Sequence, residues 1–204
     1  MPARFIAIAG NIGAGKSTMV SFMSRRFGLH PLYEPVDENP YIADFYQDMH
    51  RWSFNSQIFY LSRKYALHLT AQKSEQRIIL DRSIYEDAEI FVENLHRRRG
   101  LDTRDYNTYM ELYRTIRSEL QPPDLLIYLR CSVRGVRRRI KMRGRKSEMD
   151  IPLSYIQKLH AQYEAWFERY DLGPKAVIET EKLDYLRDII HRVDLIQQVE
   201  ELLK

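Results

Sequence analysis

The fold is decided by one stretch near the start of the chain, FIAIAGNIGAGKST at residues 5–18. Its first five residues are apolar, which is typical of a buried parallel strand. The residues that follow, GNIGAGKST at 10–18, have the spacing of the Walker A motif, a phosphate-binding loop. An amphipathic pattern then continues to Phe27 and ends at Gly28, as a helix would. A strand, a loop and a helix in this order are the context that such a loop requires, so the sequence predicts binding of a nucleoside triphosphate.

The residue types in this loop suit phosphate chemistry. Its glycines let backbone N–H groups converge on phosphate oxygens, and the N-terminus of the following helix adds partial positive charge. The Lys16 side chain reaches the outer phosphates, and the Ser17 hydroxyl is a ligand for Mg²⁺. The alternative, a Gly-rich surface turn that carries a lysine, would have to match every fixed position by chance. We therefore assign the whole loop to nucleotide binding: Gly10, Asn11, Ile12, Gly13, Ala14, Gly15, Lys16, Ser17 and Thr18.

Size and composition fit a single domain, residues 1–204, with a substantial core. The formal net charge of +4 is too small to indicate nucleic-acid binding. The single cysteine, Cys131, excludes an internal disulfide and favours a reducing compartment. We find no signal-peptide pattern, and no apolar run approaches the roughly 20 residues that cross a bilayer. We expect a cytoplasmic protein with no nucleic-acid or membrane partner.

Short apolar runs alternate with helical patterns along the chain, which predicts an α/β fold: a parallel sheet with helices on both faces. Strands are expected at residues 5–9, 32–34, 78–81, 125–129 and 176–179. Helices are expected at residues 17–27, 41–49, 53–71, 84–95, 103–120, 132–142, 153–170 and 183–203.

Ligands of open α/β sheets collect at the carboxyl ends of the strands, where this sequence has Glu34, Asp81 and Arg82. Judged by itself, Glu34 would more often be a solvated strand end. Asp81 could hold Mg²⁺ or its waters or take part in proton transfer, and its alternative role is to cap a helix. An arginine at the position of Arg82 can stabilise phosphoryl charge.

Several separated motifs, in order and over nearly the whole length, resemble the deoxynucleoside kinase family, above all its bacterial deoxyadenosine and deoxycytidine kinases. The matching segments are GNIGAGKST, YEPVDENPY, FYQDMHRWSFNSQ, DRSIYED, PPDLLIYLR and RGRKSEMDIPLSYIQKLHAQYEAW. The resemblance implies a P-loop kinase fold, with a five-stranded parallel sheet and an Arg-rich lid. It also implies ATP- and Mg²⁺-dependent 5′-phosphorylation of deoxyribonucleosides in nucleotide salvage. Glu34 would be the general base and Arg82 would lie at the 5′ end of the acceptor.

The expected lid covers residues 137–150, which are rich in arginine. Arg139 and Arg143 are four residues apart on one helical face, and Gly144 is a candidate hinge. The resemblance implies that Arg139, Arg143 and Arg145 contact ATP. A solvated basic face is the alternative, because arginine runs are common on protein surfaces.

The resemblance also implies an acceptor site. Tyr46 and Glu148 match the pair that binds the sugar 3′-hydroxyl, and Gln57 matches the glutamine that reads the base edge. Either member of the sugar pair alone would more often be a surface residue. The Gln57 amide offers both a donor and an acceptor, as adenine and cytosine require.

Three further positions concern the base. Asp87 would accept from an exocyclic amino group and disfavour thymine, and Phe91, four residues later, would stack on the base. Lys64 stands where the better-known deoxycytidine and deoxyguanosine kinases of animals have arginine, whose planar fork it cannot reproduce. We expect deoxyadenosine to be preferred, followed by deoxycytidine and deoxyguanosine.

Two alternatives to this function remain open. A nucleoside monophosphate kinase, such as a thymidylate kinase, shares the loop and the lid, and a non-catalytic nucleotide-binding scaffold would keep the fold. Family resemblance further implies a homodimer that packs through helices at 41–71 and 84–95, and a deoxynucleoside triphosphate as feedback inhibitor.

Overall fold

The computed structural model describes residues 3–34, 38–145, 148 and 151–203. Its centre is a sheet of five parallel strands in the order β2-β3-β1-β4-β5. The strands are β1 (Phe5–Ala9), β2 (His30–Leu32), β3 (Ile78–Asp81), β4 (Leu125–Arg130) and β5 (Lys175–Glu179). The predicted five-stranded parallel sheet is therefore confirmed.

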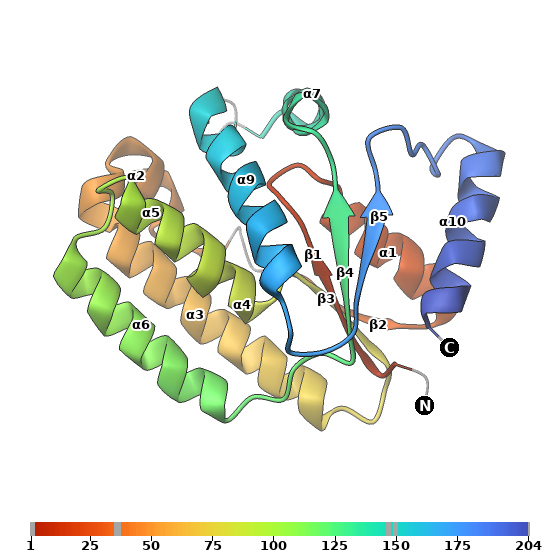
Figure 1. Cartoon of the computed structure of the whole chain (residues 1–204), viewed down its shortest axis with the longest axis horizontal. Coiled ribbons are helices and arrows are strands. Elements are labelled where there is room, and N and C mark those ends of the chain that lie inside the picture. Colours follow the sequence, from red (N-terminus) through yellow and green to blue (C-terminus); the bar gives the residue numbers. More distant parts are fainter. Residues whose placement is uncertain (1–2, 35–37, 146–147, 149–150, 204) are drawn as a thin grey trace.

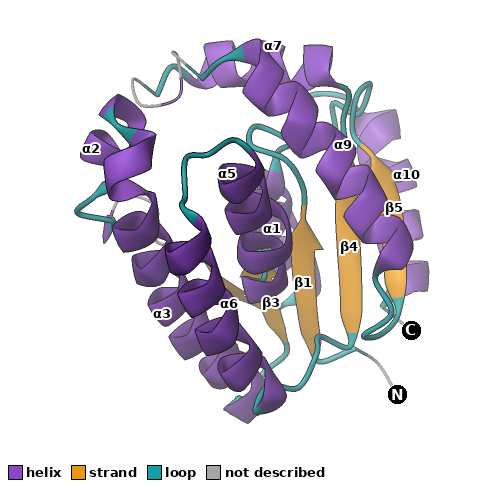
Figure 2. Ribbon diagram, turned by 60° about the vertical axis from the view of Figure 1, so that its left-hand side comes forward, coloured by secondary structure: helices purple, strands orange, loops and turns teal. Residues whose placement is uncertain are grey.

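Helices cover both faces of this sheet (Figures 1 and 2). They are α1 (Lys16–Phe27), α2 (Ile42–Gln47), α3 (Met49–Lys73), α4 (Ile84–Glu86), the π-helical segment η2 (Asp87–Val92), α5 (Glu93–Arg97), α6 (Thr103–Ser118), α7 (Val133–Arg143), α9 (Leu153–Arg169) and α10 (Ile189–Leu202). No helix in the described part of the chain is long and apolar enough to span a membrane.

The strands carry apolar side chains on both faces, because helices bury both. In β1, Ile6 and Ile8 belong to the core shared with α1, α7 and α10. Ala7 and Ala9 alternate with them and belong to the core shared with η2, α6 and α9. This second core holds most of the large aromatic side chains, among them Tyr128 of β4.

The strand order reverses direction at β1, which has β3 on one side and β4 on the other. A crevice forms at such a point outside the carboxyl ends of the strands. In Figure 1 the arrowheads of β4 and β5 point toward the end of the molecule where α7 lies. The loops after β1, β3 and β4 therefore meet at this edge.

Two predicted elements were misplaced. The second strand is His30–Leu32 and not 32–34, because its register pairs His30 with Ile78 and Leu32 with Leu80, so Glu34 lies beyond the strand end. The last helix starts at Ile189 and not at 183, because the Asp188 side chain accepts hydrogen bonds from the first backbone N–H groups of α10. The segment before Asp188 is a loop that takes part in the site.

One of the helices expected in a dimer interface, 84–95, lies largely inside the chain. Its residues 84–92 are almost wholly buried and pack against α3, α6 and α9. Parts of two motifs lie outside the described residues, namely 35–37 and, within the expected lid, 146–147 and 149–150.

Candidate active site

The phosphate loop runs between β1 and α1, as its sequence predicts. Gly13 has φ 76 and Gly15 has φ 100, in the left-handed region that favours glycine. Lys16 begins α1 and is buried, and its Nζ donates to the backbone oxygens of Gly10 at 2.8 Å and Asn11 at 3.0 Å. Burial and the nearby Arg82 lower the pKa of Lys16 to about 8, although neighbouring carboxylates oppose the shift. The ammonium is thus held at the loop's centre by carbonyl groups.

Ser17 and Asp81 form the candidate Mg²⁺ site. The Ser17 hydroxyl donates to Asp81 Oδ2 at 2.5 Å, and Asp81 Oδ1 is buried without a hydrogen-bond partner in the described structure. A hydroxyl and an unsatisfied carboxylate oxygen are hard oxygen ligands, which suit Mg²⁺. The described residues contain no group of three or more His, Cys, Asp or Glu side chains that could hold a metal.

Arg82 follows β3 and reaches under the phosphate loop. Its backbone has φ 66, a strained conformation for a residue other than glycine. Its guanidinium lies 3.4 Å from Glu34 Oε1, 3.5 Å from the Gly10 carbonyl oxygen and 4.5 Å from the ring centroid of Phe91. These contacts place a buried positive charge between the loop and the aromatic wall of the cavity.

The ammonium of Lys64 joins two carboxylates. Its Nζ lies 2.9 Å from Glu34 Oε1 and 2.9 Å from Asp87 Oδ1, and the lysine side chain is 1% exposed. Burial raises the pKa of Glu34, but Arg82 and Lys64 outweigh it and hold that pKa at about 2. Burial raises the pKa of Asp87 to about 6, against the opposing effect of Lys64. Glu34 is thus firmly ionised, and Asp87 titrates close to neutral pH.

A cavity of about 440 Å³ brings most of the predicted site together. The predicted site residues that line this cavity are Ile12, Gly13, Gly15, Lys16, Ser17, Thr18, Glu34, Tyr46, Gln57, Asp81, Arg82, Asp87, Phe91, Arg143, Arg145 and Glu148. Lys64 lies behind the wall, in contact with Glu34 and Asp87. Gly10, Asn11, Ala14 and Arg139 are outside this lining.

Polar groups in the wall suit a nucleoside. Gln57 is buried, and its Oε1 has no hydrogen-bond partner among the described residues. Burial raises the pKa of Tyr46, as do the nearby Tyr155 and Tyr60 and the Glu148 carboxylate, so its hydroxyl stays protonated and can donate. An unsatisfied amide beside donor and acceptor groups is what recognition of a base and a sugar requires.

The arginines of the expected lid separate into two sets. Arg143 forms an ion pair with Glu148, and Arg145 Nη1 lies 3.7 Å from Glu148 Oε1. Arg139 instead donates to the Ala14 carbonyl at 2.7 Å, to Thr180 Oγ1 at 3.0 Å and to the Thr180 carbonyl. Gly144 ends α7 in the left-handed conformation, a typical helix C-cap.

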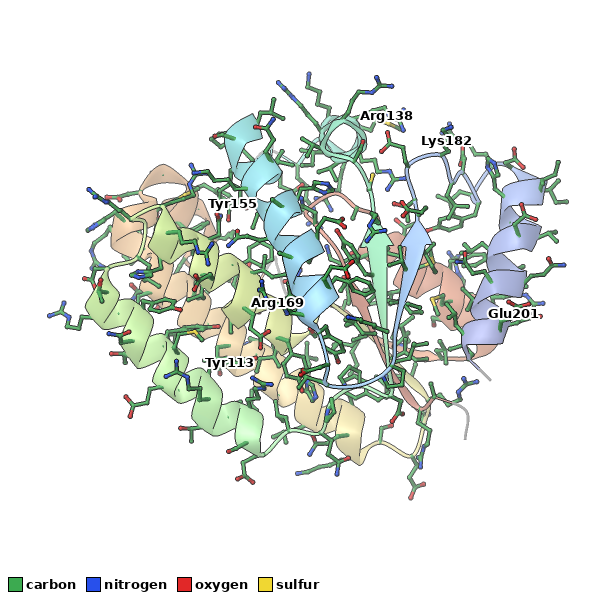
Figure 3. All side chains as sticks on the ribbon, viewed as in Figure 1. Tyr113, Arg138, Tyr155, Arg169, Lys182 and Glu201 are labelled. Carbon is green, nitrogen blue, oxygen red and sulfur yellow. The ribbon has the colours of Figure 1, made fainter. Side chains whose placement is uncertain are left out.

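A second cavity, of about 810 Å³, lies on the other side of the phosphate loop. It is formed between α7 and the loop after β5, and Figure 3 labels Arg138 and Lys182 at this edge of the molecule. Both cavities include Gly13, Gly15 and Thr18, so they meet at the loop.

Sequence reasoning missed several lining residues. Tyr60 and Tyr155 line the first cavity, and residues 180–187 line the second. The rule that ligands bind beyond strand ends would have indicated Thr180, directly after β5. No sequence signal marked the two tyrosines, because helical aromatic residues are usually core residues.

The fold and this edge of the sheet define a P-loop phosphotransferase: a phosphate loop, strand-end carboxylates and buried cations around a cavity that can hold an acceptor. The chain belongs to the deoxynucleoside kinase family, whose model matches residues 6–204. The deoxyadenosine/deoxycytidine kinase of Bacillus subtilis is 34% identical over 197 residues, covering 95% of this chain and 90% of that protein.

Two further relatives agree with this assignment. The deoxyguanosine kinase of Lactobacillus johnsonii is 34% identical, with 98% of this chain and 92% of that protein covered. Among solved structures, a deoxyadenosine kinase from M. mycoides with bound dATP superposes with a TM-score of 0.82 at 34% identity, covering 96% of this chain and 98% of that one. The resemblance and the expectation of an enzyme, a kinase, are thus confirmed.

Proposed function

We propose that the enzyme transfers the γ-phosphoryl group of ATP to the 5′-hydroxyl of a deoxyribonucleoside and serves nucleotide salvage. One observation carries the proposal: Glu34 and Arg82, from two strand ends, line a single cavity together with Lys16, Gln57 and Asp87. The phosphate groups and the nucleoside base would then occupy the two ends of this cavity, with the 5′-oxygen between them.

The roles of the residues follow from their contacts. Phosphoryl transfer depends mainly on positioning and on neutralising charge, which Lys16, Arg82 and the lid arginines supply. Both cations near Glu34 contact its Oε1, and no described residue hydrogen-bonds its Oε2, so Oε2 can accept the proton of the 5′-hydroxyl. A carboxylate with a low pKa is a weak base, which suits a transition state in which the proton leaves late.

Mg²⁺ would be held by Ser17 and Asp81 together with phosphate oxygens. When bound, it neutralises charge on the phosphates. The Ser17–Asp81 hydrogen bond keeps the two oxygen ligands together. Asp81 is also close enough to Lys16 for its charge to raise the pKa of that lysine, which favours the cationic form of the lysine.

We infer that the acceptor base carries an exocyclic amino group, with deoxyadenosine preferred over deoxycytidine and deoxyguanosine. The ionised Asp87 accepts hydrogen bonds, and its Oδ2 is buried without a partner among the described residues. The three relatives described above are named for deoxyadenosine, deoxycytidine or deoxyguanosine, and all three bases bear an amino group. The base and ribose of ATP would then occupy the second cavity, which meets the first at the phosphate loop.

The test is ADP release from Mg²⁺·ATP with each of the four deoxyribonucleosides, with the four deoxynucleoside monophosphates as parallel acceptors and a control without acceptor. We expect release that depends on a deoxyribonucleoside, with deoxyadenosine best. Activity with a monophosphate alone would instead indicate a thymidylate kinase-like enzyme. Nucleotide binding without turnover on any acceptor would favour a scaffold.

We also propose that the whole chain is one domain and that it forms a homodimer through α2 and the exposed side of α3. A single sheet with a core on each face supports the first point. Light scattering across a range of concentrations tests the second, and a constant monomer mass would contradict it.

A further inference from the structure

Glu86 is a buried carboxylate that the mechanism above does not use. It ends the short helix α4, and its side chain is 0% exposed. An ionised carboxylate in such a place is costly unless hydrogen bonds and a cation compensate it. Its hydrogen-bond partners among the described residues come from three separate parts of the site, namely Ser83, Gly10 and Tyr163.

One carboxylate oxygen has an ordinary local role. Oε2 accepts from the Ser83 backbone N–H at 2.8 Å and from the Ser83 hydroxyl at 3.1 Å. This is the capping box that the S-x-x-E spacing of residues 83–86 predicts. A capping box explains one oxygen and does not require complete burial.

The other oxygen reaches out of the helix. Oε1 accepts from the Gly10 backbone N–H at 3.2 Å and from the Tyr163 hydroxyl of α9 at 2.9 Å. The Arg82 Nε lies 3.9 Å from the same oxygen and supplies the compensating charge. Glu86 therefore connects the first residue of the phosphate loop, the catalytic arginine and α9.

Gly10 connects Glu86 to the two cations of the site, Lys16 and Arg82. Its N–H is held by Glu86, while its carbonyl accepts from Lys16 Nζ at 2.8 Å and lies 3.5 Å from Arg82 Nη2. The N–H and the carbonyl of Gly10 belong to the two peptide groups on either side of its Cα, so the backbone of this one residue links Glu86 to both cations. Lys16 and Arg82 would otherwise repel each other in a buried space.

We propose that Glu86 is a positioning residue: it orients the Gly10 end of the phosphate loop and holds Arg82 beside it, so that the phosphates meet a preformed site. Its influence on catalysis passes through Gly10 and Arg82, and it makes no contact with substrate. The proposal rests on the proposed function only in that nucleotide phosphates bind at this loop.

Glu86→Gln is the direct test because it keeps the shape and removes the charge. Four donors face the carboxylate, and an amide has one accepting oxygen, so its NH₂ group must face two of them. A hydroxyl can turn to accept from the NH₂ group, but a backbone N–H cannot. On either side of the amide a backbone N–H, of Gly10 or of Ser83, loses its partner.

Glu89→Gln is the matched control. Glu89 is on the same continuous helical segment, and it accepts from the Tyr113 hydroxyl at 2.6 Å and from Trp166 Nε1 at 2.9 Å, with Arg117 at 3.7 Å. None of these partners lines the cavity. In Figure 3 the label of Tyr113 lies far from that of Tyr155, which does line it.

Binding of Mg²⁺·ADP, measured by calorimetry, is the first readout because it needs no acceptor. We expect Glu86→Gln to weaken binding about tenfold, the effect of one unsatisfied buried N–H, while Glu89→Gln stays within about twofold. Equal effects of the two variants would overturn the proposal. A wild-type protein that binds Mg²⁺·ADP without phosphorylating any nucleoside would overturn the proposed function. The ratio of the Mg²⁺·ADP affinities of the wild type and Glu86→Gln would still test the role of Glu86.

A double-mutant cycle with Arg82→Lys is the second readout. If Glu86 acts through Arg82, Glu86→Gln lowers turnover by a much smaller factor in the Arg82→Lys background than in the wild type. Additive losses would mean that Glu86 only stabilises the fold. Unchanged turnover in the single variant would overturn the proposal as well.

Should Glu86→Gln not fold, the two hydroxyl groups separate the roles of the two oxygens. Tyr163→Phe removes a donor from Oε1, and Ser83→Ala removes one from Oε2. We expect the first to weaken Mg²⁺·ADP binding about threefold and the second to leave it within about twofold. The reverse order, or no difference, would contradict the proposal.

Discussion

At the scale of single residues, the charge of Glu34 is stabilised by its two neighbouring cations, Arg82 and Lys64. Replacing Glu34 with Gln removes the proposed acceptor of the 5′-hydroxyl proton and also leaves Arg82 and Lys64 with less compensating charge. We expect turnover to fall by about 10²- to 10⁴-fold, with the KM for the nucleoside changed only a few-fold, because the proposed base contacts, Gln57 and Asp87, remain. Steady-state kinetics at saturating Mg²⁺·ATP measure both constants.

Glu38→Gln is the control for this variant. Glu38 is exposed and pairs with Arg63 at 3.7 Å, outside the cavity lining, so its loss should leave turnover unchanged. Near-normal turnover of the Glu34 variant would remove Glu34 as the proton acceptor.

The pKa of Asp87 predicts a pH dependence of kcat/KM for deoxyadenosine. Its pKa of about 6 lies above the ordinary value, so the carboxylate that accepts from an amino group is present above this pH and is lost as the pH falls through it. We expect kcat/KM for deoxyadenosine to rise between about pH 5 and pH 7. This range lies below the Lys16 pKa of about 8 and far above the Glu34 pKa of about 2.

The matched variant is Asp87→Asn, whose amide does not titrate. Its kcat/KM for deoxyadenosine should be lower at pH 7 and nearly flat over the same interval. The same rise in the Asn variant would mean that Asp87 is not the titrating group.

At the scale of elements, the phosphate loop packs against α7. A Cβ on Gly13 would lie 2.8 Å from Ile140 Cγ1 and 3.1 Å from the Val136 carbonyl oxygen, and its φ of 76 is itself unfavourable for alanine. We expect Gly13→Ala to cost about 1 to 3 kcal/mol of stability and to weaken Mg²⁺·ADP binding about tenfold or more, because the loop or α7 must shift. Thermal unfolding and calorimetry measure the two effects.

Gly28→Ala separates the backbone effect from the packing effect. Gly28 has φ 65 and nothing within 4 Å of an added Cβ, and it ends α1 far from the phosphates. It should cost about 1 kcal/mol of stability and leave nucleotide binding unchanged. A comparable loss of binding in both variants would mean that the contact with α7 does not matter.

The sequence predicted some elements well because their signals are local. The apolar run of β1 and the Walker A spacing identify strand, loop and helix within a few residues of the structure. The second strand was displaced by two residues, because the partner that sets its register, Ile78, is far away in the sequence. The loop before α10 was read as helix because apolar spacing cannot reveal that Asp188 caps the helix at that point.

The candidate site shows the same division between local and distant signals. The strand-end rule and the family motifs indicated Glu34, Asp81 and Arg82, which line one cavity. Two features had no such signal: Lys64 shared between two carboxylates, and Glu86 beneath Gly10. Each of these contacts joins residues more than twenty positions apart, so it exists only in the packed fold and leaves no local pattern in the sequence.

At the scale of the whole molecule, two cavities meet at one phosphate loop. The loop residues Gly13, Gly15 and Thr18 line both, the buried wall with Gln57 belongs to the first, and residues 180–187 belong to the second. A deoxynucleoside triphosphate can place its base against the first wall and its phosphates on the loop, and so fill both the acceptor and the phosphate positions. The solved relative from M. mycoides contains dATP.

This arrangement predicts feedback inhibition that is competitive with both substrates. We expect dATP to raise the apparent KM for ATP and for deoxyadenosine without changing kcat, because one molecule blocks both positions. ADP is the control: we place its base in the second cavity, so we expect it to compete with ATP alone. Initial-rate measurements that vary each substrate at fixed dATP decide the pattern. Inhibition that is not relieved by deoxyadenosine would mean that dATP enters through the second cavity, as a donor does, and leaves the acceptor wall free.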